Sequence, residues 1–175
     1  IVDVGASTLD ACGFTLYENS DGDSGQALLA PVVERLGALH LLQATDQKGI
    51  ISKDFHRDCI RAFHKSMIAL VKDKDPNSAV FKRNEKLRVF ICGGGGQDPF
   101  YEKKVVRKVE KVLDDKLLAF GGFNIQPIPC PKEIEWPAGI EIKKENYHRI
   151  AVAYGLSLSS ADVGHIVPSG QVGDI

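Results

Sequence analysis

The order of strand-like and helical segments limits this chain to a small number of folds. Three apolar, strand-like segments come first, over Ile1 to Val4, Ala11 to Tyr17 and Ala27 to Val33. The connections between them, Gly5 to Thr8 and Glu18 to Gly25, are short and rich in turn-forming residues. Strands joined by such short turns are antiparallel, so the sequence predicts a three-stranded antiparallel meander.

Helices and strands alternate in the remainder of the chain. Apolar residues recur at spacings of three and four in two long segments, which indicates amphipathic helices, and a third helix follows later. The predicted order is helix, strand, helix, strand, helix, over Lys53 to Val71, Leu87 to Cys92, Pro99 to Phe120, Phe123 to Ile128 and Asn146 to Leu158. Because helical crossovers join parallel strands, the whole order, β-β-β-α-β-α-β-α, predicts an α/β fold. We expect a mixed sheet with helices on both faces, the ribonuclease H-like arrangement.

Length and charge exclude several classes of protein. With 175 residues, 43% of them hydrophobic, the chain has the size of one ordinary domain. Its 22 basic and 23 acidic residues nearly cancel, so neither nucleic acid nor a membrane surface is an expected partner. No apolar run approaches the ~20 residues of a membrane span, and no signal peptide is recognisable, which favours a cytoplasmic protein. The cysteines lack the paired spacing of a metal site; they are Cys12, Cys59, Cys92 and Cys130.

Two of the predicted strands stop abruptly at runs of small residues. Gly5 to Thr8 follows the first strand, and Gly93 to Gly96 follows the fourth. Backbone N–H groups in such turns are free to hold phosphate, and ligands of open α/β sheets collect at the carboxyl ends of strands. We therefore predict that the two loops converge on a nucleotide cleft. Taken singly, each has a simpler interpretation, as a hairpin turn and as a tight strand-to-helix turn.

Three segments resemble one family of ATPases, and they occur in the family's order. Asp3-Val-Gly-Ala-Ser-Thr-Leu-Asp10 resembles the second phosphate motif of the actin, sugar-kinase and seventy-kilodalton heat-shock chaperone ATPases, D-x-G-G-G-T-x-D in the chaperone branch. Val89-Phe-Ile-Cys-Gly-Gly-Gly-Gly-Gln-Asp-Pro99 resembles the adenosine motif of that branch, and Ala151-Val-Ala-Tyr-Gly155 its second connecting helix. The resemblance covers nearly the whole chain but only the second of the family's two lobes. It implies that this chain is a fragment of a longer protein, whose first lobe is missing.

The resemblance also implies a role for each loop residue. Asp3 would hold a water of a Mg²⁺ hydration shell, and Thr8 would bind a terminal phosphate, which makes these two the catalytic candidates. The cofactor, ATP or ADP with Mg²⁺, would otherwise be bound by the two loops, through Gly5, Ala6, Ser7, Gly94, Gly95, Gly96 and Gln97. Ala6 and Ser7 stand where the chaperones have glycine, and Gln97 where they place an arginine beside the adenine. Asp10 we interpret as a structural turn acceptor, with a direct nucleotide role as the alternative.

Two functions of different classes remain open. The main hypothesis is the nucleotide-binding lobe of a chaperone-like or actin-like ATPase, which binds Mg-ATP at the interface with the first lobe and is inactive alone. Its further partner would be a protein client or a co-factor protein. The alternative is a non-hydrolysing protein-interaction module that kept the fold and lost the nucleotide site. A small-molecule kinase of the same superfamily is a third possibility, and Trp136 lies in a loop that either caps the core or meets a partner.

Overall fold

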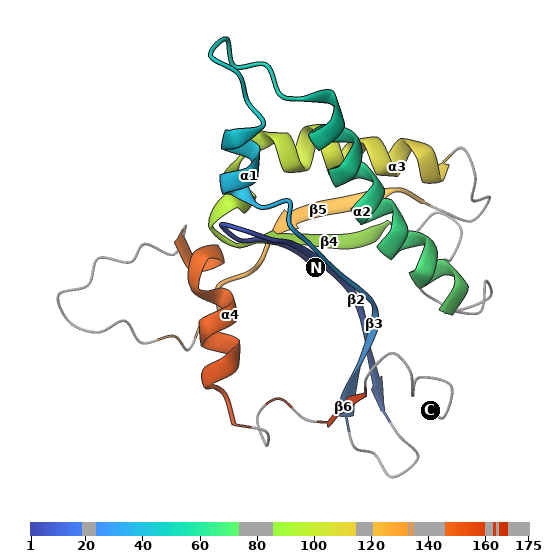
Figure 1. Ribbon diagram of the computed structural model, residues 1–175. Coiled ribbons are helices and arrows are strands. Elements are labelled where there is room, and N and C mark those ends of the chain that lie inside the picture. The colour runs from blue at the N-terminus through green and yellow to red at the C-terminus, as the bar shows by residue number, and fades with distance from the viewer. Residues whose placement is uncertain are drawn as a thin grey trace, which may run out of the picture.

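A mixed β-sheet forms the centre of the molecule (Figure 1). The computed structural model describes residues 1–18, 24–73, 86–114, 121–132, 134, 146–159, 163 and 165–167. Within these residues the sheet has six strands in the order β5-β4-β1-β2-β3-β6. The strands are β1 (Val2–Val4), β2 (Leu9–Glu18), β3 (Ser24–Glu34), β4 (Leu87–Cys92), β5 (Phe123–Pro127) and β6 (His165–Val167). The helical elements are α1 (Ala38–Gln43), α2 (Lys53–Asp73), η2 (Gly94–Gln97), η3 (Phe100–Val106), α3 (Arg107–Asp114) and α4 (Tyr147–Ser157).

The strand directions follow from the lengths of the connections. β1, β2 and β3 form the predicted antiparallel meander, because short turns join them. The helical crossovers place β4 parallel to β1, and β5 parallel to β4. Val2 pairs with Ile91 and Asp3 with Cys92, so the first and fourth strands are neighbours in the sheet. The prediction of an α/β fold with a mixed sheet is confirmed.

One face of the sheet carries most of the core. Figure 1 shows α2 and α3 against this face and α4 on the other side of the sheet. The apolar stripe of α2 repeats every three or four residues, which turns one side of the helix toward the strands. Its buried members are Cys59, Ala62, Phe63, Met67 and Leu70. Phe63 reaches the far edge of the sheet, where its ring lies 5.9 Å from that of Phe123.

β3 bends at an extra residue opposite β2. The register passes from Ala11 with Val32 to Gly13 with Leu29, so β3 holds one residue more than β2 in this interval. Ala30 lies in the left-handed region with φ 49°. The buried Ser66 hydroxyl of α2 donates a hydrogen bond of 2.8 Å to the Ala30 carbonyl and holds the bulge against the helix.

Three elements differ from the sequence-based expectation. α1 and β6 were not predicted, because α1 has six residues and one buried side chain, and β6 has three residues. The second predicted helix begins as the π-helix η3, where the buried pairs Phe100 with Val105 and Tyr101 with Val106 repeat at five residues. The centre of the turn from Glu18 to Gly25, the end of that second helix and the loop around Trp136 lie outside the described residues. None of the described helices is long and apolar enough to cross a membrane.

Candidate functional site

The two loops predicted to converge lie together at one end of the sheet. The parallel pairing of Asp3 with Cys92 brings the carboxyl ends of β1 and β4 to the same level. Gly93, with φ 79°, then passes so close to β1 that a Cβ atom there would collide with Asp3 and Val4. Gly95 packs on β1 as well, since its Cβ position is 2.7 Å from Val4 Cγ1. The glycine run is therefore required for the close contact between the turn and β1.

The turn from Gly5 to Thr8 is fixed by the start of α1. The carbonyl oxygens of Gly5, Ala6 and Ser7 accept hydrogen bonds of 3.0, 2.8 and 3.1 Å from the N–H groups of residues 38, 39 and 37. Because C=O and the following N–H point in opposite directions across a trans peptide, the N–H groups of Ala6, Ser7 and Thr8 point away from α1. The N–H of Gly5 donates instead to the Thr8 carbonyl at 2.9 Å. The turn thus presents three successive donors to one side.

Two carboxylates lie next to this turn. Asp3 and Asp10 are directly paired across β1 and β2. Among the described residues, Oδ1 of each is buried and has no hydrogen-bond partner. The Thr8 hydroxyl donates to Oδ2 of Asp10 at 3.3 Å. Asp10 therefore orients the hydroxyl of Thr8.

The pKa of the Asp3 carboxyl is raised above its ordinary value. Burial is the main cause, the charge of Asp10 adds to it, and a hydrogen bond with the Cys92 thiol acts in the opposite direction. A cation between two neighbouring, partly buried carboxylates stabilises their ionised forms, because it offsets their mutual repulsion. The described part of the chain has no cluster of three or more His, Cys, Asp or Glu side chains that could hold a metal ion. A metal here would need water or phosphate oxygens for the rest of its coordination shell, and Mg²⁺ accepts such a shell.

The glycine turn has one buried and one open part. Gly95 is buried between β1 and α1, whereas Gly94 is exposed, as is Gln97. A Cβ atom on Gly94 would meet only Arg149 of α4, whose Nε would lie 4.0 Å away. The carbonyl of His148 accepts a hydrogen bond of 2.9 Å from the Gly93 N–H and so joins α4 to the turn. The predicted residues of this turn are Gly94, Gly95, Gly96 and Gln97. Gly94 and Gln97 therefore offer the surface that is accessible to a ligand.

Sequence reasoning missed the contributions of α1 and α4. α1 holds the first turn through backbone hydrogen bonds. Since any residue type can form such bonds, the sequence does not reveal them. Arg149 precedes the Ala151 to Gly155 segment by two residues, so its position beside the second turn could have been inferred from that motif. The predicted site residues are otherwise brought together, since all belong to the two adjacent turns or to the strand ends that precede them.

A shallow groove runs beside the carboxylates on the face of the sheet opposite α2. It measures about 390 Å³ and is bordered by Asp3 and Asp10 and by apolar side chains of β2 and β3, among them Phe14, Leu28 and Val33.

Comparison with known proteins gives no relative, since no protein-family model, no curated protein and no solved structure matches this chain.

Proposed function

We propose that this chain is the nucleotide-binding lobe of a chaperone-like or actin-like ATPase. The observation that carries the proposal is the row of N–H groups of Ala6, Ser7 and Thr8, aimed away from α1 and adjacent to Asp3 and Asp10. Such a row favours an anion, whereas two carboxylates repel one. Magnesium with phosphate satisfies both, since the cation neutralises the carboxylates and the phosphate oxygens accept from the N–H groups. Mg-ATP or Mg-ADP is the ligand class with these properties.

The strand order supports the same assignment. The series β3-β2-β1-β4-β5 is antiparallel up to β1 and parallel from there, and such a mixed sheet supports a ribonuclease H-like lobe. β6 adds a further strand beyond β3. In this assignment the nucleotide lies where a second lobe would face the two turns, and that lobe is the partner we propose.

Each site residue then has a defined task. Asp3 would hold the magnesium ion through a water molecule, and Thr8 would turn its hydroxyl from Asp10 to a terminal phosphate oxygen. Bound magnesium would neutralise charge on the phosphates. At the other turn, Gly94 leaves room for a ribose or base, while Gln97 and Arg149 offer polar atoms at its border. The closely packed Gly95 shapes the turn from beneath.

One observation favours the alternative, a protein-interaction module without nucleotide. The face of β2 and β3 opposite α2 exposes large apolar side chains, with Leu16 72% and Val33 68% exposed and Phe14 and Leu28 less so. An apolar surface of this kind marks a protein contact. It fits an ATPase lobe that meets a second lobe or client, and equally a module that binds a protein alone.

Calorimetric titration separates the two functions. We expect this chain to bind Mg-ADP and Mg-ATP, and to bind ATP more weakly when magnesium is removed. Asp3→Asn and Thr8→Ala should each lower the affinity about ten- to hundredfold, the effect of losing one charge-assisted contact of roughly 1.5–3 kcal/mol. In NMR spectra the amide signals of residues 6 to 8 should shift on titration.

The matched control is Asp54→Asn, which removes an exposed carboxylate of α2 that pairs with Arg57 at 2.8 Å. Its affinity for nucleotide should equal that of the unaltered chain. A folded chain that binds neither nucleotide at millimolar concentration, yet captures a protein through its exposed sheet face, would favour the interaction module. Binding that is indifferent to both magnesium and Asp3 would contradict the proposed site.

A further inference from the structure

A buried tyrosine joins the helix after the second turn to the segment that holds the first turn. Tyr101 lies in η3 and is fully buried. Its hydroxyl donates a hydrogen bond of 2.9 Å to the carbonyl of Leu36, which lies 65 residues earlier in the chain. Burial raises the pKa of this hydroxyl, with smaller contributions from Cys59 and Asp98, so it remains a hydrogen-bond donor at neutral pH.

The carbonyl that Tyr101 contacts belongs to a peptide unit that also contacts the first turn. The C=O of Leu36 and the N–H of Gly37 form one planar trans peptide and point in opposite directions. On the far side of this unit, the Gly37 N–H donates to the Ser7 carbonyl at 3.1 Å. The Ser7 carbonyl shares its own peptide unit with the N–H of Thr8, one of the three donors proposed to bind phosphate. Tyr101 is therefore the first member of a hydrogen-bond relay that runs through these two peptide units to the Thr8 N–H.

The absence of a side chain at residue 37 lets the two peptide units lie in direct contact. A Cβ atom on Gly37 would lie 2.6 Å from both the Ser7 carbonyl carbon and the Thr8 nitrogen. Gly37 is buried, as is Tyr101. Hydrogen bonds in series polarise one another in such surroundings, so the Tyr101 hydroxyl should strengthen the Gly37 hydrogen bond and make the Thr8 N–H a better donor.

The second turn determines where Tyr101 lies. The N–H of Asp98 donates to the Gly95 carbonyl at 3.0 Å, and the Asp98 carbonyl accepts from the Tyr101 N–H at 3.2 Å. On the side of α2, Nε2 of His56 donates to the Lys104 carbonyl at 3.0 Å and fixes η3 there. A ligand that displaces the second turn would therefore also displace Tyr101 and the relay.

We propose that Tyr101 is a positioning residue of the phosphate site and couples the second turn to the first. It fixes and polarises the peptide unit between Ser7 and Thr8, so that the Thr8 N–H faces the phosphate as a stronger donor. Tyr101 acts through the backbone of Leu36 and Gly37 and does not itself contact the ligand. This inference rests on the proposed function, because that function assigns phosphate to the first turn.

The variant Tyr101→Phe removes the hydroxyl and keeps the ring. The probes are Mg-ADP and Mg-tripolyphosphate, of which the second has no base and occupies only the phosphate site. In calorimetric titrations, the affinity for both should fall about three- to tenfold, the range of one neutral hydrogen bond. In NMR spectra of the free variant, the Gly37 amide proton should move to lower chemical shift and exchange faster, because its hydrogen bond to the Ser7 carbonyl is weaker.

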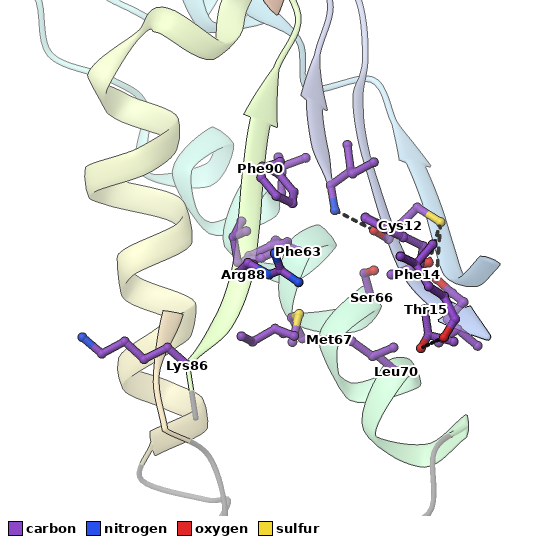
Figure 2. A pocket seen from close by; sticks show the side chains of 17 residues that line it. Cys12, Phe14, Thr15, Phe63, Ser66, Met67, Leu70, Lys86, Arg88 and Phe90 are labelled. Carbon is purple, nitrogen blue, oxygen red and sulfur yellow. Dashed lines mark hydrogen bonds between the residues drawn. The ribbon is translucent and has the colours of Figure 1, made fainter. Parts of the chain in front are cut away.

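The matched control is Ser66→Ala, which also removes a buried hydroxyl that donates to a backbone carbonyl, that of Ala30 at 2.8 Å. Figure 2 shows Ser66 on α2, beside a cavity at the Ile1 end of β1 and away from the two turns. The control should lose stability, yet keep both affinities and the Gly37 amide signal of the unaltered chain.

A measurement on the unaltered chain tests the relay whether or not Tyr101→Phe folds. Binding of Mg-tripolyphosphate should shift the ¹³C signals of the Leu36 carbonyl and of Tyr101 Cζ, while the signal of the Ala30 carbonyl stays in place. An unaltered chain that binds neither probe would overturn the proposed function and this inference with it. Binding that leaves the Leu36 and Tyr101 signals unshifted, or that is equally strong in Tyr101→Phe, would overturn this inference alone.

Discussion

Asp3 and Asp10 lie directly opposite each other on β1 and β2, and among the described residues each has a buried carboxyl oxygen without a hydrogen-bond partner. Two neighbouring carboxylates of this kind destabilise a folded chain when both are ionised. An arrangement that costs stability in the free protein is typical of a place where a cation or ligand supplies the missing contacts.

The pH dependence of stability should report on Asp3. Its folded-state pKa is raised above the ordinary value of 3.8, so ionisation disfavours the folded state. The unaltered chain should therefore lose stability relative to Asp3→Asn as the pH rises from 3.8 through the raised value, and Asp3→Asn should melt at the higher temperature at pH 7. Thermal melts between pH 3 and pH 8 measure the difference. A difference in melting temperature that stays constant over this pH range would show that ionisation of Asp3 does not destabilise the folded chain.

This chain alone should not hydrolyse ATP at a useful rate. It supplies N–H groups and carboxylates, but phosphoryl transfer also needs charge neutralisation and positioning from the side of the second lobe. Phosphate release at saturating Mg-ATP should stay at the level of the buffer. Turnover that survives purification and disappears in Asp3→Ala would show that the lobe is a complete enzyme.

Two adjacent glycines should respond differently to substitution. Gly95→Val places carbon atoms where Val4 and Ala38 already lie, at 2.7 and 2.9 Å from the Cβ position, and should cost about 1–3 kcal/mol of stability. Gly94→Ala enters open space and should leave the melting temperature nearly unchanged, while it lowers nucleotide affinity. Urea unfolding and calorimetry separate the two effects. Equal loss of stability in both variants would contradict this packing.

Cysteine reactivity should divide the four thiols into two pairs. Burial raises the pKa of Cys59 and of Cys92 to about 12, and the charge of Asp3 adds to the effect at Cys92. Cys12 and Cys130 are partly exposed. Iodoacetamide at pH 8 should therefore label Cys12 and Cys130 in the folded chain and all four in urea, as mass spectrometry of tryptic peptides would detect. Rapid labelling of Cys92 in the folded chain would contradict its burial.

The bulge of β3 should depend on Ser66. Ser66→Ala leaves the buried Ala30 carbonyl without its 2.8 Å donor and should cost roughly 1–3 kcal/mol. Ala30→Gly should stabilise the chain slightly, because glycine adopts φ 49° without steric strain. Urea unfolding of both single variants measures the two contributions. An unchanged free energy of unfolding in Ser66→Ala would indicate that another group donates a hydrogen bond to the Ala30 carbonyl.

Most of the fold could be predicted from local patterns. Each of these patterns extends over only a few residues, so it can be recognised in the sequence alone. They are the apolar segments of the first three strands, the periodic apolar stripe of α2 and the turn residues between these elements. The parallel direction of β4 relative to β1 followed from the rule that helical crossovers join parallel strands. α1 escaped prediction because a six-residue helix with only Leu41 buried has no measurable period.

The site was less accessible to sequence reasoning, because its contacts depend on register. The pairing of Asp3 with Asp10 needs the exact alignment of two strands. The burial of Gly95 likewise follows from its approach to Val4 and Ala38, which no motif encodes.

The parallel pairing of Val2 with Ile91 also has a consequence for how the chain folds. The meander and α2 bring together neighbours in sequence, whereas β1 and β4 are separated by roughly ninety residues, and closing so long a loop slows folding. We expect β2, β3 and α2 to associate early and β4 to dock late onto β1. The two turns would then come together only in the last step, so a chain arrested before that step would carry a formed hairpin and no binding site.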